Sequence, residues 1–324
     1  VIGCGHGGGL SLDALHRSDH YQLIAAADPS VAARHSVADR FPNAGVFEDF
    51  HEMLANCDAE VVCIATPAPS HASIARVVLG HQPRGLLLEK PLAPDVAAAE
   101  AVLKEVRATG CPVVVPHGLL VLPAMQEVKA RIRRGDVGNI ASVEVQNAVD
   151  LLNAGIHWLV YLIDVFDNDE PTSVTARFDV TDHVVNDGVQ VESIGTTTVE
   201  LQSGIRIVLH SGNRTVPSSN VLPPEEQQGA LFRVTGSEGV IEFSAWAGSY
   251  WIQRGKSDGV FVKQSLPAGV SYHRLFLEQL ADNIAEGKPK YRSAELSLAA
   301  LKLIETAYRQ QGESEWRLGV AAEK

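Results

Sequence analysis

The sequence contains few cysteines, and these show no regular spacing. Its four cysteines (Cys4, Cys57, Cys63 and Cys111) form no CxxC pair, which argues against a disulfide framework or a thiolate metal site. Cys63 lies in an apolar run and Cys111 precedes another, so we expect buried free thiols in a reducing compartment. No stretch reaches the roughly 18 apolar residues of a membrane span, and no signal peptide is recognised. The expected location is therefore the cytoplasm.

Positive charge is also scarce. Lysine and arginine together number 27 against 39 aspartates and glutamates, which gives a formal net charge of −12. An acidic surface repels phosphate backbones and anionic lipids, so neither nucleic acid nor a membrane is expected as a partner. A locally basic pocket for an anionic cofactor remains compatible with this charge. With 324 residues, 45% of them hydrophobic, the chain is long enough for two globular domains.

The first 118 residues alternate between strand-like and helix-like segments. Strands are expected at 1–2, 22–27, 46–47, 60–65, 85–88 and 111–115, and helices at 31–40, 50–56, 71–79 and 97–109. This alternation is typical of βαβ units that build a parallel sheet covered on both faces. We therefore predict an α/β domain over residues 1–118.

A different pattern begins after residue 118. An amphipathic helix at 123–134 precedes period-two strands at 140–149, 173–180, 196–202, 205–211, 231–235, 240–243, 250–253 and 260–264. Two helices, at 272–286 and 293–311, close the chain. This pattern predicts a second, α+β domain over residues 119–324, with a mainly antiparallel open sheet and helices on one face. Residues 212–229 are expected to form a mobile loop near the site.

A glycine-rich motif directly follows the first strand. Gly3-Cys4-Gly5-His6-Gly7-Gly8 matches GxGxxG, in which the glycines allow a tight turn, close approach of a pyrophosphate and close packing of the next helix. Phosphates would bind at the N-terminus of that helix, where unpaired N–H groups favour negative charge. We therefore predict that Gly3, Gly5, His6, Gly7 and Gly8 bind a dinucleotide. A plain structural turn is the alternative.

Asp28 strengthens this prediction because it closes the second strand, where a carboxylate can accept hydrogen bonds from both ribose hydroxyls of an adenosine. It would repel a 2′-phosphate, so NAD is expected rather than NADP. Arg34 is the opposing signal, but we expect it to point to solvent.

A lysine follows the fifth predicted strand, at residues 85–88. Leu86-Leu87-Leu88 leads into Glu89-Lys90-Pro91, and the carboxyl ends of parallel strands are where open α/β sheets bind ligands. Desolvation beside a cationic nicotinamide would lower the pKa of Lys90 toward a value useful for acid/base catalysis. A surface lysine in a strand–helix turn is the alternative.

These pieces, in this order, resemble the glucose–fructose oxidoreductase, inositol dehydrogenase and rhizopine-catabolism family. Besides the glycine motif and Asp28, the resemblance is carried by Ala65-Thr66-Pro67 with His71, Glu89-Lys90-Pro91, Arg134-Gly135-Asp136-Val137-Gly138-Asn139-Ile140 and Asn153-Ala154-Gly155-Ile156-His157. It runs the whole chain and implies a Rossmann domain followed by a sheet domain, with sugars, inositols or related polyols as substrates.

The resemblance also implies roles for individual residues. Lys90 would be catalytic, and His157 would be an acid/base group or a substrate ligand. Thr66, Pro67, His71 and Glu89 would lie with Lys90 along the cofactor, and the open face of the sheet would form a homo-oligomer. Outward-facing Val199, Leu201 and Val208 are expected to supply apolar contacts there.

The sequence departs from the family pattern in the substrate half. Val160 replaces an acidic residue, Asn153 replaces an aspartate, and Leu120 lies where an arginine is often found. His117 follows the last strand of the first domain, so His117 and Asn153 join Lys90 and His157 as candidate substrate ligands. A satisfied core histidine is the alternative for His157. No histidine spacing indicates a metal site.

We therefore predict hydride transfer between a secondary alcohol and nicotinamide, with Lys90 and His157 at the reacting hydroxyl. Two alternatives remain open: an enzyme that retains NAD and cleaves glycosides, and a non-catalytic dinucleotide-binding regulatory protein.

Overall fold

The described chain divides into two units. The computed structural model describes residues 1–167, 169–179, 181–182, 184–186, 189–287 and 289–310. The first unit comprises residues 1–116 and 268–298, and the second comprises residues 117–267 and those from 299 onward. Residues 268–298 thus group with the first unit, whereas the predicted second domain spans residues 119–324. None of the described helices is long and apolar enough to span a membrane.

A parallel sheet forms the centre of the first unit. Its strands are β1 (Ala25–Ala27), β2 (Gly45–Phe47), β3 (Val61–Ile64), β4 (Gly85–Leu88) and β5 (Val113–Val114). Ile2 bridges in parallel to both Ala27 and Ile64, so the order is β2-β1-Ile2-β3-β4-β5. This is a doubly wound Rossmann order, with its switch point between Ile2 and β3. The predicted fold of this part is confirmed.

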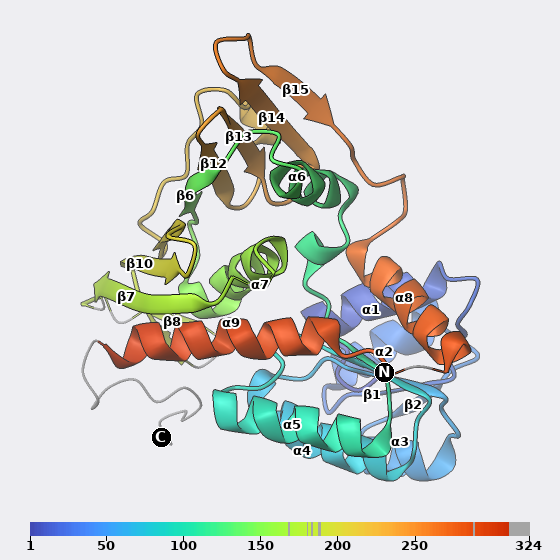
Figure 1. The fold of residues 1–324 in the computed structure, drawn as a ribbon. Coiled ribbons are helices and arrows are strands. Elements are labelled where there is room, and N and C mark those ends of the chain that lie inside the picture. Colours follow the sequence, from blue (N-terminus) through green and yellow to red (C-terminus); the bar gives the residue numbers. More distant parts are fainter. Residues whose placement is uncertain (168, 180, 183, 187–188, 288, 311–324) are drawn as a thin grey trace. The chain divides into compact units, whose positions relative to one another are not determined.

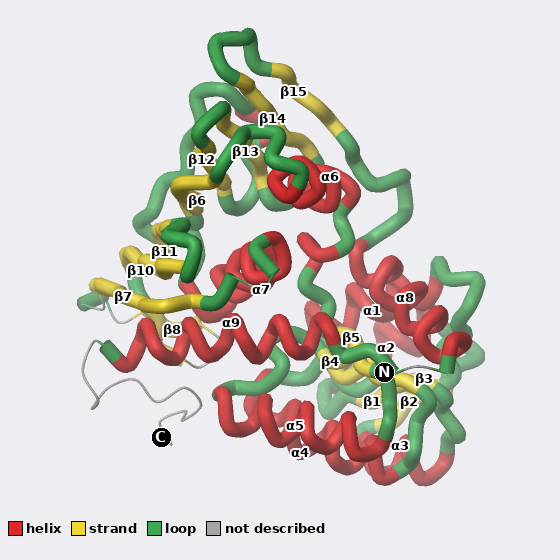
Figure 2. Tube along the Cα trace, viewed as in Figure 1, coloured by secondary structure: helices red, strands yellow, loops and turns green. Residues whose placement is uncertain are grey.

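Helices cover both faces of this sheet, as Figure 2 shows in red around the yellow strands. They are α1 (His6–His16), α2 (Val31–Arg40), α3 (Phe50–Asn56), α4 (Ala68–Gly80), α5 (Val96–Thr109) and α8 (Tyr272–Glu286). Helices α1 and α8 pack together, as do α4 and α5. The side chains of Leu280 and Ile284 contact Gly85, at which an added Cβ would lie 2.8 Å from Ile284. This contact explains why α8 belongs to the first unit.

The second unit contains an eight-stranded sheet. Its order is β15 (Val260–Lys263), β14 (Ser249–Arg254), β13 (Gly239–Ser244), β12 (Leu231–Gly236), β6 (Ile140–Gln146), β11 (Arg206–Ser211), β10 (Ile194–Leu201) and β7 (Pro171–Asp179). All neighbouring pairs are antiparallel except β11 with β6, which confirms the mainly antiparallel sheet. A small hairpin, β8 (Val184–Asn186) with β9 (Val189–Val191), was not predicted.

Three helices cover one face of this sheet: α6 (Pro123–Arg133), α7 (Ile156–Val165) and, from residue 299 onward, α9 (Arg292–Arg309) (Figure 1). The core between them is aromatic. Tyr161 of α7 packs edge-on against Phe232 and Phe243, while Tyr308 of α9 contacts Phe178. The inward-facing residues of the strands therefore pack against α6, α7 and α9. None of these three helices lies on the opposite face of the sheet.

The opposite face is more polar than expected. Val199 and Leu201 are only 1% and 5% exposed, because they point toward the helix-covered face. Val208 pairs with Thr198 rather than with either of them, so it lies on the other face. The prediction that Val199 and Leu201 point outward is therefore wrong. A homo-oligomer built on this sheet keeps Val208 as support and stays a prediction.

The segment 212–229 is hydrogen-bonded to side chains on the outer face of the sheet, and its mobility stays a prediction. The amide of Ser218 donates to Gln146 at 2.9 Å, and the hydroxyl of Ser219 donates to Glu242 at 2.6 Å. Glu226 is paired with Lys263 at 2.5 Å. The carboxamide and carboxylate side chains of the strands therefore hold this segment.

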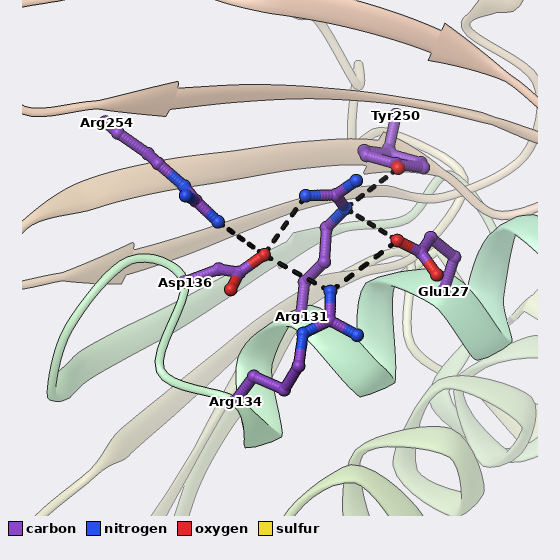
Figure 3. Close-up of polar contacts among 6 residues, drawn as sticks. All are labelled: Glu127, Arg131, Arg134, Asp136, Tyr250 and Arg254. Carbon is purple, nitrogen blue, oxygen red and sulfur yellow. Dashed lines mark hydrogen bonds and ion pairs between the residues drawn. The ribbon is translucent and has the colours of Figure 1, made fainter.

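An arginine cluster ties α6 to the sheet (Figure 3). The carboxylate of Asp136 accepts from Arg131 at 3.0 Å, Arg134 at 3.4 Å and Arg254 at 2.5 Å. Arg131 also donates to the hydroxyl of Tyr250 at 2.9 Å. Burial would raise the pKa of Asp136, but the hydrogen bonds and charges of Arg134 and Arg254 outweigh it and lower that pKa. The predicted helix-to-sheet junction is thus an ionic one.

Candidate functional site

The glycine motif forms a tight turn between Ile2 and α1. Gly3 has a φ of +84°, and a Cβ there would lie 2.7 Å from the carbonyl oxygen of Ala65. A Cβ at Gly8 would lie 2.0 Å from the oxygen of Gly3, so neither position accepts a side chain. At Gly5, by contrast, a Cβ would meet nothing within 4 Å. The chain therefore leaves open space beside the N-terminus of α1, and no acidic residue lies in the first turn of that helix. This arrangement fits a pyrophosphate.

Asp28 is bound to the same turn. One carboxylate oxygen accepts the amide of Cys4 at 2.7 Å, and the other accepts the amide of Ser30 at 2.8 Å. The side chain is half-buried, and each oxygen keeps a second lone pair. Asp28 therefore shapes the glycine turn and retains the capacity to accept ribose hydroxyls.

Arg34 does not point to solvent, so that expectation is wrong. Its side chain is only 18% exposed. The guanidinium donates to the carbonyl oxygens of Asp28 at 2.8 Å and Pro29 at 2.9 Å, and it pairs with Glu48 at 3.1 Å. Because Ser30 caps α2, residue 34 lies one turn into the helix and faces back toward the end of β1. A cation therefore lies next to Asp28.

His71 joins the turns that follow β3 and β4. It is fully buried, with Nε2 2.7 Å from the carbonyl oxygen of Thr66 and Nδ1 2.9 Å from that of Pro91. Burial lowers the pKa of His71, although both carbonyls favour the protonated form. Pro67 is exposed at the start of α4. His71 thus holds the two turns at the carboxyl ends of β3 and β4, the edge where open α/β sheets bind ligands.

Glu89 and Lys90 follow β4. Lys90 is half-buried, and the peptide bond between it and Pro91 is cis. Glu89 is buried and accepts a hydrogen bond from Nε2 of His273 at 2.5 Å. His273 was not predicted, because it lies 184 residues further along the chain and no local motif marks it.

Two predicted histidines meet in the second unit. His117 and His157 are both buried, and their Nδ1 atoms are 3.3 Å apart. A hydrogen bond between two imidazole nitrogens requires that one be protonated and the other not. Trp246 and Trp158 contact the ring of His157. Neither tryptophan was predicted, since a single aromatic residue in a sequence carries no positional signal.

Asn153 lies in a π-helical segment (Leu151–Gly155) that leads into α7. Asp150 precedes this segment, and its carboxylate accepts both the backbone amide and the side-chain amide of Asn153. An aspartate thus lies three residues before Asn153 and binds it. Val160 is fully buried in α7, so the acidic group of the family pattern has no counterpart at that position.

The predicted residues thus form two groups. The glycine turn, Asp28, the turns joined by His71, and Lys90 lie in the first unit, whereas His117, Asn153 and His157 lie in the second. That Lys90 and His157 act on one hydroxyl stays a prediction.

A family model described as an oxidoreductase family with an NAD-binding Rossmann fold matches residues 1–117. Over these residues the chain is similar to this family. D-apiose dehydrogenase of Paraburkholderia graminis is 23% identical over 95% of this chain and 86% of its own length. Inositol 2-dehydrogenase of Rubrobacter xylanophilus is 36% identical over 32% of this chain and 30% of its own length. The predicted family is confirmed, and the chain is an oxidoreductase.

Solved structures share the fold of this chain. An oxidoreductase from Agrobacterium radiobacter, crystallised with NAD+, L-tartaric acid and magnesium, has a TM-score of 0.77 at 20% identity, over 95% of this chain and 94% of that one. The 3-ketoreductase KijD10 from Actinomadura kijaniata, in complex with TDP-benzene and NADP, has a TM-score of 0.77 at 19% identity, over 95% of both chains. Neighbours of this fold thus bind either NAD or NADP.

Proposed function

We propose that this oxidoreductase transfers hydride between a secondary alcohol of a sugar, an inositol or a related cyclic polyol and NAD. The observation that carries the proposal is the open space at Gly5 beside the N-terminus of α1, in the same unit as Asp28 and Lys90. Relatives named for D-apiose, inositol and trans-1,2-dihydrobenzene-1,2-diol support a vicinal diol on a small ring as substrate.

Each group of residues has a role in this reaction. The bound dinucleotide supplies the hydride acceptor. The N-terminus of α1 would hold its diphosphate, and Asp28 its ribose hydroxyls. Lys90 would take the hydroxyl proton as hydride leaves the carbinol carbon. His117 and His157 would bind the hydroxyl, and their shared proton lets one ring nitrogen accept while the other donates.

NAD is the proposed cofactor because Asp28 would repel a 2′-phosphate. Arg34 opposes this preference, but its guanidinium is already engaged by two carbonyl oxygens and by Glu48. We also propose that the protein acts in the cytoplasm, where its free cysteines stay reduced. Burial raises the pKa of Cys63 and of Cys111 to about 11, so neither is a reactive thiolate.

The test is NADH formation, followed at 340 nm, across sugars, inositols and cyclic diols. We expect at least one to reduce NAD+ with one equivalent of ketone formed per NADH. A substrate that is cleaved while NAD+ is regenerated would identify the glycoside-cleaving alternative instead. Absence of turnover with every alcohol, alongside tight binding of NAD+, would favour a regulatory protein and contradict the proposal.

A further inference from the structure

We propose that His273 is a positioning residue that holds Glu89 between the glycine turn and Lys90, and so fixes both for hydride transfer. The inference rests on the proposed function, because the role of Lys90 comes from it. All the residues involved lie in the first unit.

The carboxylate of Glu89 is bound on both sides. One oxygen accepts from Nε2 of His273 at 2.5 Å, and the other accepts from the backbone amide of Lys90 at 3.2 Å. Glu89 is 8% exposed and His273 is 1% exposed. A carboxylate buried to this degree requires a partner that offsets its lost hydration, and the imidazole is that partner.

The stem of Glu89 packs against the glycine turn. A Cβ at Gly7 would lie 3.2 Å from Cγ and 3.3 Å from Cδ of Glu89, so the two residues are in close contact. Gly7 lies in the first turn of α1, where the diphosphate is expected. Glu89 therefore touches both the cofactor-binding helix and the backbone of Lys90. A displacement of its carboxylate would therefore shift both the first turn of α1 and the backbone of Lys90.

His273 is held by the helix that carries it. Ser271 caps α8 by accepting the amide of Arg274 at 3.2 Å. Further along α8, Leu277 is fully buried and its carbonyl oxygen accepts the hydroxyl of Tyr21 at 2.8 Å. The first two turns of α8 are thereby anchored, so the imidazole presents Nε2 to Glu89 from a held backbone.

The other imidazole nitrogen indicates that His273 serves Glu89 alone. Nδ1 is buried and has no hydrogen-bond partner within the described part of the chain. A buried nitrogen without a partner destabilises the folded state, and an apolar side chain would avoid that cost. The hydrogen bond to Glu89 is the polar contact that justifies a histidine at this position.

Two conservative variants separate positioning from general stability. In His273→Gln, the amide nitrogen can reach the position of Nε2 and donate to Glu89. In His273→Asn, the shorter amide reaches only the position of Nδ1, which faces no partner. Asn283→Leu is the matched control, since Asn283 is another buried polar residue of α8 with an unpaired oxygen.

With NAD+ and the best alcohol of the screen, we expect His273→Asn to lower kcat at saturation by about tenfold, at the low end of the effect of misplacing a catalytic group. Its Kd for NAD+, measured by fluorescence titration without substrate, should rise about threefold to fivefold, the scale of one lost hydrogen bond. His273→Gln should recover most of both changes, and Asn283→Leu should change neither. Urea unfolding of all three variants reports their stability.

The inference is overturned if His273→Asn keeps wild-type kcat and Kd, or if His273→Gln falls as far as His273→Asn. It is also overturned if Asn283→Leu reproduces the loss, because the effect would then follow stability. An unmodified protein that oxidises no alcohol would instead sink the proposed function, and the NAD+ titrations would still report on His273.

Discussion

Each unit buries a glutamate that binds the backbone at or leading to a proposed functional residue, and the two units satisfy that carboxylate in different ways. Glu89 in the first unit is bound by His273, which can carry a positive charge. Glu192 in the second unit is 1% exposed and is bound by three neutral donors. These are the amide of Leu151 at 2.7 Å and the hydroxyls of Ser211 at 2.5 Å and Tyr308 at 2.7 Å.

The difference matters because Glu192 anchors the segment that leads to the histidine pair. Leu151 begins the π-helix that carries Asn153 and runs into α7 with His157. Burial raises the pKa of Glu192, and its hydrogen bonds offset only part of that rise. The first unit thus positions its lysine through a potential ion pair. The second positions its histidine through hydrogen bonds that neutral donors make to Glu192.

The largest expected effect is at the groups that the two glutamates support. Lys90→Ala should lower turnover by about 10²–10⁴-fold, the scale of a positioned acid/base group. His157→Ala should lower turnover by a smaller factor, because no acidic residue at position 160 stabilises the protonated form of His157. The double variant should lose less than the product of the two, since groups acting on one hydroxyl are not additive. The exposed Lys104, replaced by alanine, is the control. Near-normal turnover of Lys90→Ala would move the catalytic role to the second unit.

The next effect is on stability. Glu192→Leu should destabilise the protein by roughly 3 kcal/mol or more, since each buried donor left without an acceptor costs about 1–3 kcal/mol. Glu192→Gln keeps an acceptor for the amide of Leu151, so its stability should fall far less. Urea unfolding of the full chain measures both, with the more exposed Glu200→Gln on β10 as control. Equal unfolding midpoints for Glu192→Leu and the unmodified protein would remove Glu192 as an anchor.

The third prediction concerns cofactor choice in the first unit. This unit also places Arg34 through an ion pair, with Glu48. Asp28→Ala should weaken NAD+ binding and erode the preference over NADP+. Glu48→Gln releases one restraint on Arg34 and should improve NADP+ binding by up to about tenfold, which corresponds to about 1.4 kcal/mol. Fluorescence titrations with both cofactors measure this. Tighter binding of NADP+ than NAD+ by the unmodified protein would contradict the assignment to NAD.

The smallest effect is a pH dependence of stability. The pKa of Glu192 is higher in the folded state than its ordinary value of 4.5, so the folded state binds the proton more tightly. Its contribution is fully present below pH 4.5 and is lost as the pH rises through the raised folded pKa. The unmodified protein should therefore gain stability relative to Glu192→Gln as the pH falls from 7 toward 4.5. Parallel stability curves for the two proteins would contradict the raised pKa.

Local signals explain what the sequence predicted well. The predicted helices at 31–40, 50–56 and 272–286 match α2, α3 and α8, because Ser30, Asp49 and Ser271 cap them. The glycine turn and Asp28 were predicted for the same reason, since a motif within 30 residues fixes their geometry. Long-range partners were not predictable in this way. His273 meets Glu89 across 184 residues, and Tyr308 meets Glu192 across 116.

Other misses have a different physical origin. Which face Val199 takes depends on strand register, and one residue of shift inverts every side chain. The direction of Arg34 depends on where Ser30 starts α2. The π-helix at Leu151 forms where Glu192 and Asp150 bind its first amides, and neither contact is visible as a period in the sequence.

The return of α8 to the first unit has a consequence for how the protein is made. During synthesis, residues 1–116 leave the ribosome long before residues 268–298, which complete their unit. Until then Gly85 lacks its cover of Leu280 and Ile284, and the carboxylate of Glu89 has no imidazole. A fragment cut after residue 117 would carry the whole family match and yet expose this apolar surface. The first unit is therefore encoded first, but it is completed only after residues 117–267 of the second unit have been made.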